Sequence, residues 1–199
     1  MSESTRKQFL QAALKLFAER GFYGASIAAI ATELGLTKQA LLHHFGTKEK
    51  LYGEVLALIS AALSEVTDAI IAEQLEPAQR LEALVLAQYQ DQMNHPDAAR
   101  LIMRELLDNE KRAAEVGNWY LKSYLELLVA TAGQIDVSGK MDEGRLLAMV
   151  YQLLGAAHYF AVSGPTLGQI FGAGHYRQTQ NAFEDELRVL IRSRLAAIQ

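Results

Sequence analysis

The stretch "SIAAIATELGLTKQALLHHFGTKEKL", residues 26–51, contains three residues that can start a helix. Ser26, Thr37 and Thr47 are of the types that cap helix N-termini through a side-chain oxygen. Gly35 can end the helix that Ser26 starts, and Thr37 can start the next helix only two residues later. A short connection of this kind is typical of a helix-turn-helix unit. We therefore expect two short helices, after Ser26 and Thr37, and a longer helix after Thr47.

A preceding helix completes a small core. It starts near Ser4 and ends at Gly21, and its apolar residues recur at helical spacing. We expect it to form the third wall against the two short helices. The residues expected on the inner faces are Phe9, Ala13, Leu14, Phe17, Ile27, Ile30, Ala31, Leu34, Leu41 and Phe45.

The rest of the chain also reads as helices, without the alternation typical of strands. Pro77 starts one helix, "NHPD" at 94–97 breaks the chain, and a short helix then holds Leu101. A longer helix is expected over about 111–134. Asp142 caps another, over 143–162, and glycines 164, 168, 172 and 174 predict an irregular link before a last helix at 179–198. The fold class is therefore all-α.

Composition narrows the classes of function. Half of the 199 residues are hydrophobic and 21% are charged, as in ordinary globular proteins. There is no cysteine, which excludes disulfides and thiolate sites. The N-terminus lacks the apolar core of a signal peptide, and no uninterrupted apolar run approaches the ~20 residues of a membrane span. We expect a cytoplasmic protein that does not enter a membrane.

Charge is unevenly distributed along the chain. Residues 1–52 carry seven Lys/Arg and four Asp/Glu, so +3, whereas residues 53–199 carry twelve and nineteen, so −7. A basic N-terminal region on an acidic body suggests that only the N-terminal region meets a polyanion.

The 26–51 stretch, with the preceding "ALKLFAERGFYGAS", closely resembles the tetracycline-repressor (TetR) family of bacterial transcription regulators. The similarity covers about residues 8–52. It implies a helix-turn-helix DNA-binding domain at 1–52 and a larger helical effector-binding and dimerisation domain at 53–199. One departure is Leu42, where the family usually has a tyrosine that contacts the DNA backbone. Leu42 can instead contact a base methyl group or pack inward.

In a helix-turn-helix unit the N-terminus of the recognition helix meets base edges in the major groove. Lys38 can donate to guanine and Gln39 can pair with adenine. Helix starts favour phosphate, because their backbone N–H groups are free. The predicted DNA-binding residues are Ser26, Thr37, Lys38, Gln39, Ala40, Leu42, His43, His44, Thr47 and Lys48.

A metal or catalytic site at the two histidines is the competing interpretation. Adjacent helical residues point about 100° apart, so His43 and His44 do not converge on one ion. No acid-and-histidine cluster, catalytic elbow or phosphate-binding glycine loop accompanies them. We expect neither metal, cofactor nor catalysis.

The acidic region, residues 53–199, is expected to bind a second copy of the chain and a small effector. A two-fold operator requires a homodimer. The 143–162 helix is apolar on nearly every side, which is more than its own core needs. We therefore expect this helix and the last helix to form a four-helix bundle with the same two helices of a second copy. The resemblance also implies a small, largely apolar effector. The predicted dimer contacts are Leu154, Ala157, Ala161, Leu187 and Ile191, and the predicted effector contacts are Tyr89, Met93, Trp119, Tyr120, Tyr124, Tyr151 and His158.

Two other classes of function stay open at this point. The chain could be a helical small-molecule carrier or enzyme without operator binding, or a protein-interaction module that has lost DNA binding. Binding of a palindromic duplex distinguishes these from a ligand-released repressor.

Overall fold

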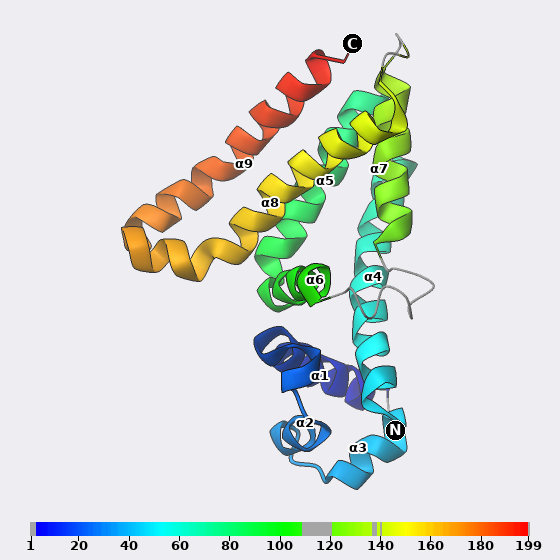
Figure 1. Cartoon of the computed structure of the whole chain (residues 1–199), viewed down its shortest axis with the longest axis vertical. Coiled ribbons are helices and arrows are strands. Elements are labelled where there is room, and N and C mark those ends of the chain that lie inside the picture. Colours follow the sequence, from blue (N-terminus) through cyan, green and yellow to red (C-terminus); the bar gives the residue numbers. More distant parts are fainter. Residues whose placement is uncertain (1–2, 109–120, 137–138, 140, 199) are drawn as a thin grey trace. The chain divides into compact units, whose positions relative to one another are not determined.

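The computed structural model describes residues 3–108, 121–136, 139 and 141–198, with side chains described from residue 6 onward. These residues are helical and contain no strand, which confirms the predicted all-α fold (Figure 1). The helices are α1 (Glu3–Gly24), α2 (Ile27–Glu33), α3 (Lys38–Phe45), α4 (Lys48–Ala72), α5 (Pro77–Asn94), α6 (Pro96–Asp108), α7 (Lys122–Ile135), α8 (Glu143–Phe171) and α9 (Ala173–Ala196).

The chain forms two compact units, which we call the N-terminal and the C-terminal unit. The N-terminal unit comprises the described residues up to Ala62 and α6 from Asp97 onward, and the C-terminal unit comprises residues 63–96 and the described residues from Leu121 onward. Sequence reasoning placed the boundary at residue 52 and assigned α6 to the body. The compact units divide inside α4, and α6 groups with the helices of residues 1–62, because its partners lie on α1 and α4. The functional boundary at residue 52 stays a prediction.

The core of the N-terminal unit forms where the sequence predicts it. Phe17, Ile30, Leu41 and Leu51 are fully buried, and Phe9 and Phe45 are nearly so. The backbone leaves the helical conformation at Gly21, with φ 70° and ψ 172°. Such a φ favours glycine. The predicted break after the first helix is therefore present.

The C-terminal unit is built from α5, α7, α8 and α9 around a second core. Its most deeply buried side chains come from all four helices: Leu81, Leu84, Leu128, Met149, Leu153 and Ile191. In Figure 1 the end of α8 and the start of α9 project together beyond α5 and α7 as a helical hairpin. The turn between them is at Gly172, whose φ is +83°.

The predicted irregular link over residues 164–174 is wrong. Helix α8 continues through Pro165 and ends only at Phe171. Tertiary packing outweighs the helix-breaking residues here. Gly164 faces α9 so closely that an added Cβ would lie 2.5 Å from the Tyr176 hydroxyl oxygen. Gly164 therefore allows α8 and α9 to approach closely and does not form a turn.

Within the described part of the chain, two helices reach the length and average hydropathy of a membrane span, although neither contains an uninterrupted apolar run of that length. The mean hydropathy is 1.8 over a window of α4 and 1.4 over a window of α8. Of the α8 window 44% is buried inside the structure, against 17% for α4. Length and composition alone do not separate a membrane helix from a core helix of a soluble protein.

Candidate DNA-binding surface

Three hydroxyl caps set the local geometry of the N-terminal unit. Ser26 Oγ accepts from Ala29 N at 3.1 Å, and Thr37 Oγ1 accepts from Ala40 N at 3.1 Å. Thr47 Oγ1 accepts from Lys50 N at 3.2 Å. All three predicted caps are therefore confirmed, and each satisfies a backbone donor that the first turn of a helix leaves free.

The turn between α2 and α3 is as tight as predicted. Gly35 takes φ +65°, and Leu36 N donates to Ala31 O at 2.8 Å. Leu41 and Phe45 then face the core. The opposite side of α3 therefore faces solvent.

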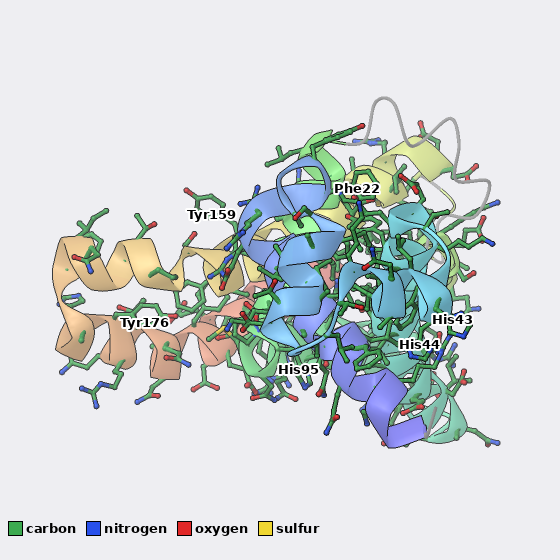
Figure 2. All side chains as sticks on the ribbon, turned by 90° about the horizontal axis from the view of Figure 1, so that it is seen from below. Phe22, His43, His44, His95, Tyr159 and Tyr176 are labelled. Atoms are coloured by element: carbon green, nitrogen blue, oxygen red, sulfur yellow. The ribbon has the colours of Figure 1, made fainter. Side chains whose placement is uncertain are left out.

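The solvent side of α3 holds the polar residues predicted to meet DNA. Lys38, Gln39, His43 and His44 are exposed, whereas Ala40 and Leu42 are half-buried. Figure 2 shows the two histidines beside each other at one edge of the unit. The partial burial of Leu42 leaves both of its predicted roles open.

His43 and His44 are exposed, and each lies close to another ring. The ring centroids of His43 and His44 are 5.6 Å apart, and His44 also lies 5.7 Å from the Phe9 ring. No group of three His, Cys, Asp or Glu among the described residues could hold a metal ion.

The start of α4 adds a basic group and a helix N-terminus. Lys48 Nζ lies 4.4 Å from the centroid of the Phe22 ring, which in turn makes an edge contact with Tyr52. At the same helix end, the backbone N–H of Glu49 and the Thr47 hydroxyl lower the pKa of the Glu49 carboxyl. This N-terminus therefore favours negative charge, the property that suits phosphate.

Sequence reasoning did not include Phe22 in the site. The ring is half-buried and lies under the Lys48 ammonium, a cation–π arrangement. Residues 22 and 48 belong to different elements, so no local periodicity pairs them. Only the folded chain reveals that an aromatic residue orients this lysine.

Helix α6 is the other contribution that the sequence did not reveal. Arg104 donates from Nε to Ala18 O and from Nη2 to Glu19 O, both at 2.8 Å. The neighbouring Glu105 is buried and accepts a hydrogen bond from the Tyr52 hydroxyl. Arg104 satisfies backbone carbonyls near the end of α1, and Glu105 attaches α6 to α4.

The predicted effector residues fall into three groups. Tyr89, Tyr124 and His158 are buried in the C-terminal unit, and Met93 packs against its core. Tyr151 does not point into this core, because it is 47% exposed on α8. Trp119 and Tyr120 lie outside the described residues.

The buried tyrosines are polar groups in an apolar setting. Tyr124 donates its hydroxyl to Leu84 O at 2.9 Å, and burial raises the pKa of this phenol. Burial, with smaller contributions from Glu184 and Tyr176, raises the pKa of Tyr89 to about 12. Both phenols are therefore neutral donors at physiological pH.

An open groove of 640 Å³ lies elsewhere in this unit, between α5 and α9. Its floor is apolar, and Arg192 forms a two-bond ion pair with Glu82 at its rim, at 2.7 and 2.8 Å. None of the predicted effector residues lines this groove.

Most of the predicted dimer contacts lie in the core of the single chain. Ala157, Ala161, Leu187 and Ile191 are all buried within the single chain, and only Leu154 is half-buried. These four residues lie on the inner faces of α8 and α9, and a dimer interface on these helices stays a prediction. An all-round apolar helix gives no periodicity from which to choose a face.

The outer faces of the same helices carry the exposed apolar residues. In Figure 2 Tyr159 points away from the α8–α9 pair, whereas Tyr176 lies between the two helices. Tyr159 is 72% exposed. The exposed large apolar residues of α8 and α9, which we together call the outer apolar face, are Leu147, Tyr151, Tyr159, Ile170, Phe171, Val189 and Leu190.

Comparisons with known proteins agree with this geometry. Residues 9–55 match the family model described as "Bacterial regulatory proteins, tetR family". The HTH-type transcriptional repressor NicS of Pseudomonas putida is 29% identical over 117 residues, which are 59% of this chain and 55% of that protein. The match thus spans only about half the length of NicS.

Two further likenesses extend over more of the chain. The HTH-type transcriptional regulator RutR of Escherichia coli K12 is 24% identical over 174 residues, 84% of this chain and 79% of that protein. A TetR-like transcriptional regulator from Rhodococcus superposes with a TM-score of 0.71 at 21% identity, over 98% of both chains, which shows a common fold. With its capped helix-turn-helix unit and its helical C-terminal unit, the chain belongs to the TetR family of DNA-binding transcriptional regulators.

Proposed function

We propose that this regulator is a homodimeric repressor that binds a palindromic operator and is released by a small, largely apolar effector. The observation that carries the proposal is the solvent face of α3, which presents Lys38 and Gln39 at a capped helix N-terminus. On this face the Lys38 ammonium and the Gln39 amide, which can both bind base edges, lie at the end of the helix that enters the major groove.

The ten predicted DNA-binding residues divide into two roles. Gln39 and Lys38 read bases, with Ala40 allowing close approach and Leu42 making apolar contact. His43, His44 and Lys48 contact phosphate, as do the helix starts at Ser26, Thr37 and Thr47. Phosphate contacts supply affinity that falls with salt, and base contacts supply specificity.

The second copy covers the outer apolar face of α8 and α9. Leu147, Tyr151 and Tyr159 lie on one side of α8, and Leu190 belongs to the exposed side of α9. Burying these residues removes apolar surface from water and leaves the C-terminal core of each copy unchanged. A protein partner also explains the high mean hydropathy of α8 without a membrane, and the proposed protein works in the cytoplasm.

The effector acts by changing the separation of the two recognition helices. A bound dimer must hold them about 34–36 Å apart, one turn of DNA. An effector with different affinities for the two states shifts this spacing, and operator DNA must weaken effector binding by the same factor.

Selection of bound genomic DNA fragments with the purified full-length protein tests the proposal. A two-fold symmetric sequence with half-sites one helical turn apart is the expected result. Sedimentation of the protein with the selected duplex then gives its stoichiometry. Enrichment of no sequence, or one copy bound to an asymmetric site, would refute the palindromic, dimeric mode and favour a carrier or a protein-interaction module.

A further inference from the structure

Two glutamine oxygens in the C-terminal core are unusual. Gln88 and Gln92 lie four residues apart on α5 and are 6% and 2% exposed. The Oε1 atom of each is buried and has no hydrogen-bond partner among the described residues. A buried acceptor without a donor costs roughly 1–3 kcal/mol, so folded proteins rarely keep one without a reason.

The amide of Gln92 contacts a histidine of a neighbouring helix. Its Nε2 lies 2.9 Å from Nδ1 of His158 on α8. An amide nitrogen can only donate, so Nδ1 is the acceptor and the imidazole hydrogen is on Nε2. In this orientation the Gln92 carbonyl oxygen points away from His158 and is the atom left without a donor.

Two buried hydroxyl groups of the same unit are satisfied, whereas the Arg80 Nε atom, like the two glutamine oxygens, has no partner. The Tyr124 hydroxyl donates to Leu84 O, and the Thr131 hydroxyl donates to Leu127 O at 2.7 Å. Among the described residues, the two glutamine atoms are the only buried side-chain oxygens without a partner. They lie one helical turn apart, on residues whose side chains share a face of α5.

We infer that Gln88 and Gln92 form a polar subsite for a neutral ligand that presents hydrogen-bond donors, such as a primary carboxamide or an N–H heterocycle. The inference rests on the proposed effector role of this unit and specifies the chemistry of the effector. A carboxylate ligand is disfavoured, because it would set further acceptors against the two carbonyl oxygens. The apolar side chains around α5 would contact the rest of the ligand.

The first test needs no ligand. Gln88→Met replaces the amide with an apolar side chain of similar shape, so we expect the melting temperature of the free protein to rise by roughly 2–4 °C. Tyr124→Phe is the matched control, since it removes a satisfied hydroxyl and should lower the melting temperature. A fall in melting temperature for Gln88→Met would show that the amide is structurally required, and would overturn the inference.

The second test uses three probes of nearly equal shape. Benzamide presents two N–H donors, benzoate presents acceptors only, and methyl benzoate carries no donor. Ligand-observed NMR at millimolar concentration should detect benzamide on the wild-type protein. We expect its binding to weaken roughly tenfold in Gln88→Met and again in Gln92→Met, which corresponds to one hydrogen bond each.

The outcomes separate this inference from the proposed function. Benzoate or methyl benzoate binding as well as benzamide, benzamide binding unchanged by both substitutions, or benzamide failing to bind would each overturn the inference while leaving operator binding intact. Benzamide binding that depends on both glutamines, without any effect on affinity for the selected operator, would uphold the subsite but contradict release by an effector.

Discussion

The N-terminal and C-terminal units differ in how their predicted sites lie in the fold. Of the DNA-binding residues predicted from sequence, seven of ten are exposed, and Ala40, Leu42 and Lys48 are half-buried. Of the predicted dimer contacts, four of five are buried in their own core. Residue types therefore predict which side chains face solvent more reliably in a short amphipathic helix than in a long helix that is apolar on every side.

The difference has a simple physical origin. In α3 the buried Leu41 and Phe45 are four residues apart, so the remaining positions must face solvent. In α8 apolar residues occupy both faces, with Leu153 in the core and Tyr159 outside. Helical periodicity then cannot distinguish a core from an interface.

The largest expected effect comes from a charge placed on the inner face of α9. Leu187 is 2% exposed, and a buried, unpaired carboxylate costs several kcal/mol, a large part of a typical domain's stability. We expect Leu187→Asp to unfold the C-terminal unit, as measured by circular dichroism. Ser193→Asp, at an exposed position of the same helix, is the control. If the Leu187→Asp variant folds but stays monomeric, Leu187 contacts the second copy rather than the core of its own chain.

A charge on the outer face should separate association from folding. We expect Tyr159→Asp to keep its helical signal while dimer affinity falls roughly tenfold or more, because an aromatic contact at an interface centre is lost. Sedimentation over a range of concentrations measures this affinity. Lys122→Asp, exposed on α7, should leave association unchanged. An unaltered dimer for Tyr159→Asp would place the interface away from this face.

In the N-terminal unit, the exposed amide of Gln39 offers a test of base reading. We expect Gln39→Ala to relax preference at one base-pair position in each half-site, at a cost of roughly 1–3 kcal/mol. Binding to a set of singly substituted operators measures this. Equal losses on every operator would make Gln39 a positioning residue.

The smallest effect is expected for Lys48, whose contact is with phosphate. We expect Lys48→Ala to weaken binding similarly on all duplexes and to reduce the slope of log affinity against log salt by about one. Titrations at several salt concentrations measure the slope. Glu73→Ala, at an exposed position after α4, should not change it. A slope equal to that of the wild type would remove Lys48 from the interface.

Helix α6 and Phe22 show what local sequence patterns miss. Arg104 binds carbonyl oxygens 85 and 86 residues away in the chain, and Phe22 lies under a lysine of another helix. Such contacts follow from the packing of separate elements. The free acceptors of Gln88 and Gln92 are of the same kind, since glutamine on a helix is unremarkable until its burial is known.

The sequence by itself determined the helical fold, the three hydroxyl caps, the tight turn at Gly35 and the polar face of α3, because each depends on residues within one or two helical turns. Tertiary structure alone decided the rest. It determined which face of α8 and α9 enters the core, joined α6 to the N-terminal unit, and carried α8 through Pro165 to Phe171. Each of these outcomes depends on apolar burial and hydrogen bonds between residues far apart in the chain, which override local propensity.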